Sequence, residues 1–217
     1  MTLSNPFSIF LSQAEERHRS LPGDNTVRDP VAIITHAITI NVPPDRVWPW
    51  LAQMGAGRAG WYSYDRVDNG GTESAWHLIP EYQNIARGDL LPAVPGSADA
   101  FIVASLEPQR DLVLTAPARS GPCRVSWEFF LDPIGRGRTR LIVRGRVARH
   151  WLEGPEDRGR DPEHPFFIER VYRLMAKMPR PIMFMIAGLG HSIMQARQLR
   201  GLKRRAEGEY RSSNHGA

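Results

Sequence analysis

The sequence predicts an α+β fold in which helices pack on one face of an antiparallel sheet. Residues 32–42 alternate between two faces and are rich in β-branched side chains, as in a half-buried strand. From residue 181 to about 207, apolar residues recur every three or four positions, which predicts a long C-terminal helix. Four intervening segments have strand character and join through short, hairpin-like connections: 100–106, 112–115, 124–131 and 139–147.

The composition is that of one ordinary globular domain. The chain has 217 residues, of which 41% are hydrophobic and 24% are charged. These values exclude a wholly disordered chain, a collagen-like fibre and a disulfide-stapled mini-protein. Cys123 is the only cysteine, so it cannot form an intramolecular disulfide, and we expect a reducing, cytoplasmic location. No histidine stands near Cys123 in the sequence, which argues against a catalytic thiol.

The formal net charge is +5, and the excess of basic residues falls in the second half of the chain. Such an excess can attract phosphates or an anionic membrane. The basic residues are mostly interleaved with acidic ones or lie on expected strands, and no zinc-finger or RNP-type motif accompanies them, so we expect no nucleic-acid partner. The N-terminus does not have the pattern of a signal peptide. The longest apolar run, residues 182–190, is too short to span a membrane.

An N-terminal helical extension is expected over residues 1–30. Asn5 followed by Pro6 is a helix-start signal, and Pro22 to Asn25 breaks the helix. Its apolar stripe comprises Phe7, Phe10, Leu11 and Ala14.

After the first strand, a helix is expected over residues 46–54. Residues 55–60 then read G-x-G-x-x-G, but a helix precedes them where a dinucleotide site needs a strand, so we interpret them as a flexible connection. The aromatic-rich residues 60–68 are interpreted as a helix ended by Asn69-Gly70-Gly71.

The C-terminal part is expected to start with a loop. Residues 153–165 are rich in Pro, Gly and charge. A helical period begins at Phe166, Pro179 and Pro181 interrupt it, and the long helix follows. Residues 209–217 are expected to be a disordered tail.

Several segments resemble the START/Bet v 1-like (SRPBCC) superfamily, and within it a bacterial subgroup of largely uncharacterised members. They include ITINVPPDRVWPWL at 38–51, GRAGWYSYD at 57–65, IPEYQ at 79–83 and GLKRRAE at 201–207. The resemblance implies a helix-grip domain over residues 31–208, in which a curved sheet wraps around the C-terminal helix and encloses a cavity. It does not fix the function, because the superfamily includes lipid and hormone carriers, polyketide cyclases, chaperone activators and oxygenase domains.

A cavity of this kind is mostly apolar, with a few polar groups that orient the ligand. The alternative for any one candidate apolar residue is that it simply fills the core. The candidate apolar liners are Trp61, Tyr62, Tyr64, Trp127, Phe129, Met183, Ile186 and Met194.

The polar candidates are open to two interpretations. If the strand face carrying Arg144 is turned inward, its guanidinium could hold a carboxylate or phosphate of the ligand. The alternatives are an outer polar face or a cross-strand pair with Glu128. His191 and Asp65 complete the candidate ligand-binding set, although His191 could be a structural hydrogen-bonder and Asp65 a capping residue. The acid–base candidates are Tyr64, Asp65, His77, Glu128 and His191.

No cofactor or metal is expected. The sequence has no H-E-x-x-H, C-x-x-C, P-loop or G-x-S-x-G motif, and its histidines are scattered singly.

Three functions remain open. The first is binding of a small hydrophobic molecule, lipid- or polyketide-like, without catalysis. The second is a cyclase or dehydratase that uses Tyr64 and Asp65. The third is a membrane-surface or protein-interaction module, suggested by the apolar residues 182–190 and the basic residues that follow them. The basic residues are Arg197, Arg200, Lys203, Arg204 and Arg205. The sequence leaves the ligand's identity and the oligomeric state open.

Overall fold

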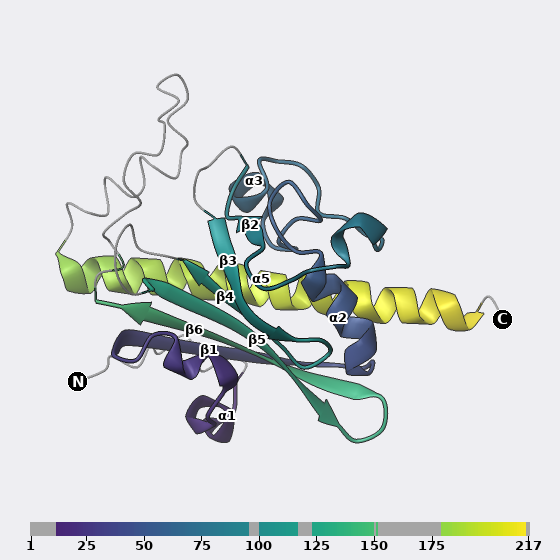
Figure 1. Cartoon of the computed structure of the whole chain (residues 1–217), viewed down its shortest axis with the longest axis horizontal. Coiled ribbons are helices and arrows are strands. Elements are labelled where there is room, and N and C mark those ends of the chain that lie inside the picture. Colours follow the sequence, from purple (N-terminus) through teal and green to yellow (C-terminus); the bar gives the residue numbers. More distant parts are fainter. Residues whose placement is uncertain (1–11, 96–99, 117–122, 150, 152–178, 216–217) are drawn as a thin grey trace.

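The computed structural model describes residues 12–95, 100–116, 123–149, 151 and 179–215. Its centre is a six-stranded antiparallel sheet in the order β1-β6-β5-β4-β3-β2, with a long helix along one face (Figure 1). The strands are β1 (Pro30–Ile40), β2 (Leu90–Pro92), β3 (Ala100–Glu107), β4 (Asp111–Ala116), β5 (Val125–Ile134) and β6 (Arg138–Ala148). The helices are α1 (Ala14–His18), η2 (Pro22–Asn25), α2 (Pro44–Ala52), α3 (Asp65–Asp68), η3 (Pro80–Tyr82) and α5 (Arg180–His215).

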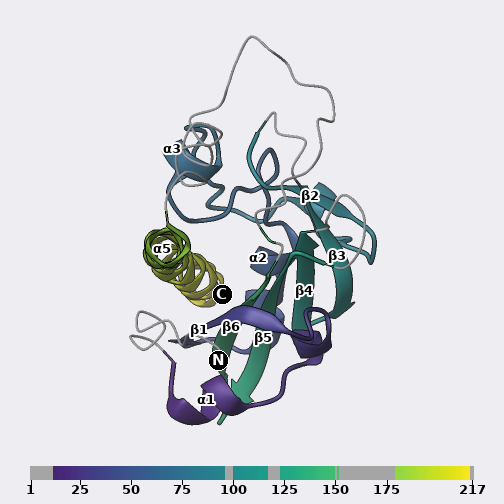
Figure 2. The same cartoon turned by 90° about the vertical axis from the view of Figure 1, so that its left-hand side faces the viewer.

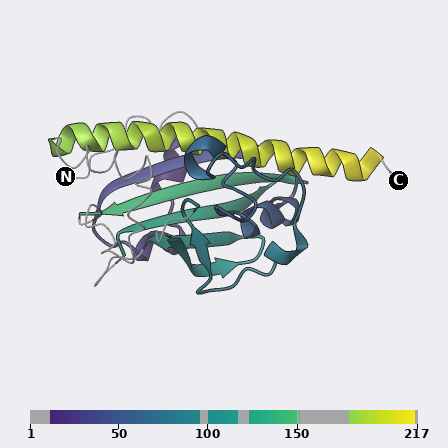
Figure 3. The same ribbon diagram turned by 90° about the horizontal axis from the view of Figure 1, so that it is seen from above.

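The expected α+β helix-grip arrangement is confirmed. All five strands predicted from the sequence are present, with β2 as an additional short edge strand. Helix α5 runs alongside β1, while α2 packs against α5 and the ends of β5 and β6 (Figure 3). The sheet therefore has an inner face toward α5 and an outer face away from it.

Side-chain alternation in β1 and β6 decides what each face carries. His36 and Ile40 of β1 lie opposite Val143 and Thr139 of β6, and Ile40 and Val143 belong to the inner core. Since successive residues of a strand point to opposite faces, Ala37 and Ile142 lie on the outer face. The fully buried inner core includes Trp50, Leu51, Met54, Phe129, Leu199 and Leu202.

The described part of the N-terminal segment covers the outer face. Figure 2 shows α1 and α5 on opposite sides of the sheet. Ion pairs hold the segment there, from Arg140 to Glu16 at 2.6 Å and from Arg144 to Asp24 at 2.8 Å. The helix expected to begin at Asn5 lies mostly outside the described residues, and α1 begins at Ala14.

Two elements differ from the sequence-based expectation. The helix expected over residues 60–68 is reduced to the single turn of α3, because Gly60 and Tyr62 have φ angles of 79° and 61°, which a right-handed helix does not contain. Helix α5 extends to His215, where a disordered tail was expected from residue 209. No proline interrupts this stretch, so helix propagation continues through it. The expected loop at 153–165 and the helical period from Phe166 lie outside the described residues.

Candidate functional site

An aromatic cluster occupies the inner face of the sheet beneath α5. The ring of Trp127 on β5 lies 5.4 Å from that of Trp61, 5.4 Å from that of Phe101 and 4.8 Å from that of Phe129, measured between centroids. Trp61 is fixed by its indole N–H, which donates to the carbonyl of Ala93 at 2.9 Å. These large flat surfaces suit contact with an apolar or aromatic molecule.

Trp127 also connects the floor of the sheet to α5. Its Nε1 donates a hydrogen bond to Oε1 of Gln195 at 3.0 Å, and its ring lies 6.5 Å from that of His191. Gln195 in turn donates to Gln198 at 2.7 Å. A polar chain thus runs along the buried side of the helix directly above the aromatic floor.

Two histidines face each other across this interior. The rings of His36 on β1 and His191 on α5 are 6.2 Å apart. Burial lowers the pKa of both to about 4, and in His36 the neighbouring His191 contributes to the lowering. Both rings are therefore neutral at pH 7, and each offers one hydrogen-bond donor and one acceptor.

Several polar atoms in this interior have no hydrogen-bond partner among the described residues. They include both ring nitrogens of His36 and the hydroxyl of Ser192, all buried, and the indole nitrogen of Trp50 deeper in the core is a further one. Buried polar groups are normally paired, so each such atom calls for an explanation. Gly145 leaves the sheet without a side chain beneath His191, whose Nε2 lies 3.8 Å from the position that a Cβ would take.

The burial pattern of α5 explains why polar groups gather there. Its buried stripe carries Ser192 and Gln195 in the first half and Leu199, Leu202 and Ala206 in the second. The second half packs into the hydrophobic core, as an amphipathic helix normally does. After the buried Met183, residues 185–195 instead bury Ser192 and Gln195 and expose large apolar side chains.

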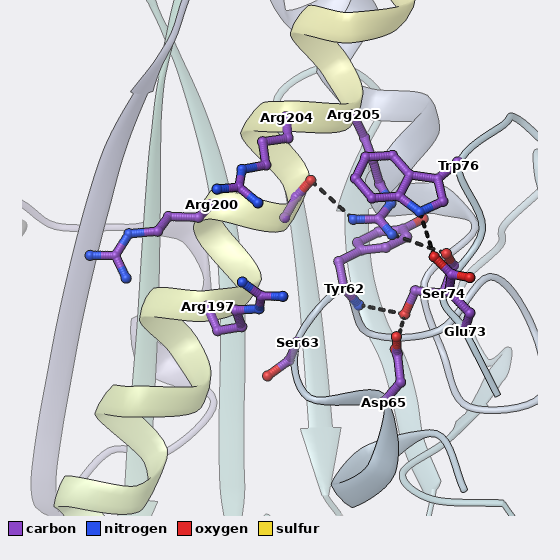
Figure 4. A pocket seen from close by; sticks show the side chains of 11 residues that line it. Tyr62, Ser63, Asp65, Glu73, Ser74, Trp76, Arg197, Arg200, Arg204 and Arg205 are labelled. Carbon is purple, nitrogen blue, oxygen red and sulfur yellow. Dashed lines mark hydrogen bonds between the residues drawn. The ribbon is translucent and has the colours of Figure 1, made fainter. Parts of the chain in front are cut away.

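A small polar pocket lies between α5 and the segment from Tyr62 to Trp76 (Figure 4). Its volume is about 100 Å³, and it is lined by Tyr62, Ser63, Asp65, Glu73, Ser74, Trp76, Arg197, Arg200, Gly201, Arg204 and Arg205.

Arg205 lines this pocket and is held by the surrounding backbone. Its guanidinium donates to the carbonyls of Ala75 at 2.6 Å, Ser74 at 3.0 Å and Gly201 at 3.3 Å. It also lies over the ring of Trp76, 4.0 Å from the centroid. Arg205 therefore ties α5 to the loop and has little capacity left for a ligand.

The structure brings together only some of the residues singled out from the sequence. Trp61, Trp127, Phe129 and His191 gather in the interior, whereas Tyr62 is buried with its hydroxyl donating to the carbonyl of Trp50 at 3.1 Å. Burial raises the pKa of the Tyr62 hydroxyl far above neutrality, so it does not exchange protons near pH 7.

The remaining candidates lie elsewhere. Tyr64 is 43% exposed and its ring lies beneath Arg197, while Asp65 accepts a hydrogen bond from Ser74 at the polar pocket. Met183 is buried near the start of α5, and Ile186 is 42% exposed.

Arg144 does not face the interior, so the expectation that it meets the ligand there needs correction. Val143 belongs to the inner core, and strand alternation turns Arg144 outward. There its guanidinium bonds the carboxylate of Asp24 and the carbonyls of Arg19 and Glu16, at 2.8, 2.8 and 2.7 Å. Glu128 is its cross-strand neighbour, as the alternative interpretation held.

Sequence reasoning missed His36, Ser192 and Gln195. For His36 a signal was present, because one histidine interrupts an isoleucine-rich strand face at Ile34, Ile38 and Ile40. Ser192 and Gln195 occur at helical spacing next to His191, but the wide apolar surface around them concealed which side is buried.

The comparisons with known proteins bear on the fold alone. No family model and no curated protein matches the chain. Solved structures that align with this chain include the Zhui aromatase/cyclase from Streptomyces sp. R1128, at 17% identity over 83% of this chain and 96% of that one, with a TM-score of 0.41. The sheet order and the long C-terminal helix agree with the resemblance stated from the sequence. The chain's own topology, an antiparallel sheet along a long C-terminal helix, is the helix-grip arrangement.

Two further solved structures align with the chain at similar scores. The polyketide cyclase-like protein Cgl2372 from Corynebacterium glutamicum is 15% identical over 82% of this chain and 93% of its own, with a TM-score of 0.39. The HSP90 activator PFC0360w from Plasmodium falciparum is 11% identical over 72% and 96%, with a TM-score of 0.37. None of these similarities assigns a ligand or a reaction to this chain.

Two further features are absent from the described residues. In this part of the chain, no three His, Cys, Asp or Glu side chains are grouped so that they could hold a metal ion. None of the described helices is long and apolar enough to cross a membrane.

Proposed function

We propose that the protein binds a small, mainly apolar molecule bearing a hydroxyl or carbonyl group, between the inner face of the sheet and the first half of α5. The aromatic surfaces of Trp61, Trp127 and Phe129 would contact the apolar body of the ligand. The polar group would meet His36 and Ser192.

The observation that carries this proposal is the set of unpartnered buried polar atoms. The two nitrogens of His36 and the hydroxyl of Ser192 lack partners among the described residues. Leaving such groups unpaired costs about 1–3 kcal/mol each, and a ligand that supplies the missing hydrogen bonds recovers that free energy on binding. Neutral histidine and serine can each donate and accept, so they suit an uncharged polar group.

The pKa values favour binding over acid–base catalysis. A general base works best when its pKa lies near the operating pH. The pKa values of His36 and His191 are about 4, so these rings are weak bases at pH 7. The cyclase or dehydratase alternative assigned acid–base roles to Tyr64 and Asp65. Asp65 lines the polar pocket and accepts from Ser74, while the ring of Tyr64 lies beneath Arg197, so neither side chain is part of the aromatic cluster.

Native mass spectrometry of the freshly purified protein, followed by solvent extraction, tests whether the protein retains a molecule. Titration with 2-naphthol and with naphthalene then separates the polar from the apolar contribution. We expect 2-naphthol to bind more tightly because its hydroxyl can meet His36 and Ser192.

Variants sharpen this test. Ser192→Ala and His36→Leu should each weaken 2-naphthol binding by about tenfold, which corresponds to one hydrogen bond, and leave naphthalene binding unchanged. The matched control is Ser20→Ala, at an exposed serine, which should change neither. The proposal fails if neither compound binds, or if both interior variants bind 2-naphthol as the wild type does.

A further inference from the structure

The exposed side of α5 forms a single continuous ridge. Apart from the neighbours Met185 and Ile186, its positions follow one another at spacings of three or four residues, so they lie along one side of the helix. With a rise of 1.5 Å per residue, the ridge is about 33 Å long. We define the α5 ridge as Ile182, Met185, Ile186, Leu189, Ile193, Arg197, Arg200 and Arg204.

The first half of the ridge is apolar and exposed. The exposed fractions of Met185 and Ile193 are 59% and 50%, and those of the other three apolar members lie between 39% and 45%. No Asp, Glu, Lys or Arg occurs from residue 182 to 196. His191, the one titratable side chain in this stretch, is neutral at pH 7 because burial lowers its pKa to about 4.

This exposure does not result from a lack of buried positions on the helix. In the same turns, the buried side of α5 carries Ser192 and Gln195. From residue 185 to 195, large apolar side chains therefore occupy the outer surface while Ser192 and Gln195 are buried, the reverse of an ordinary surface helix. A contiguous exposed apolar surface of this kind marks an interaction site.

The second half of the ridge is cationic. Arg197, Arg200 and Arg204 form no ion pair among the described residues, and the guanidinium of Arg197 lies over the ring of Tyr64, 5.8 Å from its centroid. The nearby acidic side chains are engaged elsewhere, since Asp65 accepts from Ser74 and Glu73 accepts from Trp76 (Figure 4).

Two of the basic residues that the sequence analysis grouped with these three, Lys203 and Arg205, do not belong to the ridge. Lys203 points to the sheet side, where it bonds the carbonyl of Thr39 at 2.8 Å and Glu207 at 2.5 Å. The guanidinium of Arg205 donates its hydrogen bonds to three carbonyls of the loop and the helix. The outward charge of this stretch is thus confined to the ridge.

We propose that the α5 ridge lies on the surface of an anionic lipid bilayer, with its apolar half inserted among the acyl chains and its three arginines on lipid phosphates. An apolar segment in line with cationic side chains is the pattern of a helix that rests in the plane of the interface. Two copies pairing antiparallel through the apolar halves would leave all three arginines of each copy without an anion. A bilayer satisfies both halves at once.

Vesicle sedimentation tests this proposal, with full-length protein and vesicles of equimolar phosphatidylcholine and phosphatidylglycerol. Wild type should sediment with these vesicles at low salt and less at high salt. Each arginine near an anionic surface contributes about 1 kcal/mol, so Arg197→Gln/Arg200→Gln/Arg204→Gln should lower the partition coefficient about 100-fold. The charge-matched control is Arg87→Gln/Arg110→Gln/Arg136→Gln, at exposed positions off the ridge, and should lower it less than about tenfold.

The apolar half is tested separately by Met185→Gln/Ile193→Gln. Because both positions are exposed, the fold should tolerate the change, which circular dichroism verifies. This variant should sediment less than wild type at every salt concentration. The proposal is overturned if wild type stays in the supernatant, or if the ridge and control arginine variants sediment alike. It is also overturned if sedimentation velocity shows a dimer that Met185→Gln/Ile193→Gln dissociates.

Discussion

Replacing Gly201 by alanine tests the close approach of α5 to the backbone of Tyr62. A Cβ at this position would stand 2.2 Å from the carbonyl oxygen of Tyr62 and 3.0 Å from its Cβ. Ordinary van der Waals contact begins at about 3.4 Å. The helix and the Tyr62 segment would have to separate by about 1 Å.

The Tyr62 segment has little freedom to move away. Tyr62 already has a φ of 61°, its hydroxyl is bonded to Trp50, and its ring lies 4.6 Å from the guanidinium of Arg205. Overpacking at such a position costs about 3 kcal/mol, and the better helix propensity of alanine returns about 1 kcal/mol. We therefore expect Gly201→Ala to lower the free energy of unfolding by about 2 kcal/mol.

The matched control is Gly190→Ala on the same helix, where nothing lies within 4 Å of the position of a Cβ. There the propensity gain acts alone and should raise the free energy of unfolding by about 0.5–1 kcal/mol. In thermal unfolding followed by circular dichroism, Gly201→Ala should lower the Tm by about 4–8 °C and Gly190→Ala should raise it by about 1–4 °C. If both variants raise the Tm equally, the close approach of α5 to Tyr62 is refuted.

Three further predictions concern buried charge. Burial, with Asp24 nearby, raises the pKa of Glu128 to about 7 from 4.5, so the free energy of unfolding of the wild type falls as the pH rises from 4.5 to 7. In urea unfolding, Glu128→Gln should remove this decline, and its free energy of unfolding should exceed that of the wild type by about 3 kcal/mol at pH 8. Parallel pH profiles of the two proteins would contradict this prediction. His36 and His191 have lowered pKa values of about 4, so the unfolded state takes up protons first as the pH falls from 6.5 to 4, and the free energy of unfolding falls with it. His36→Leu should reduce this fall in the same assay. If the loss of stability between pH 6.5 and 4 is unchanged in the variant, His36 is excluded as a cause. Arg144→Met should lower the free energy of unfolding by about 2–4 kcal/mol, because it leaves two backbone carbonyls unpaired and removes one of the two guanidinium partners of Asp24. A loss below about 1 kcal/mol would show that the network is dispensable.

The strands and the long helix were predictable from the sequence because local periodicity reports them. Alternation in residues 32–42 placed Ile34, His36, Ile38 and Ile40 on one face, and the register of β1 with β6 confirms that grouping. Helix α5 was predicted from its repeat of apolar residues. Both signals depend on neighbours along the chain.

The site was less predictable because periodicity assigns faces but not what covers them. The alternation that separates Val143 from Arg144 is visible in the sequence, but the N-terminal segment that covers Arg144 is identified only by the fold. The encounter of His36 with His191 joins the first strand to the last helix. On α5, residues 182–196 are apolar on most sides, so the sequence could not show that Ser192 and Gln195 are the buried ones.

The attachment of the N-terminal segment to the outer face has an evolutionary consequence. Arg144 and Arg146 share the carboxylate of Asp24, and Arg144 also donates hydrogen bonds to the carbonyls of Glu16 and Arg19. In a homologue that lost this segment, the two guanidinium groups would lie on an uncovered sheet face without the Asp24 carboxylate. Selection would then no longer maintain the two arginines. In an alignment of related sequences, the segment and these two arginines should therefore be gained and lost together, which makes the arginine pair a marker for chains that carry the same cover.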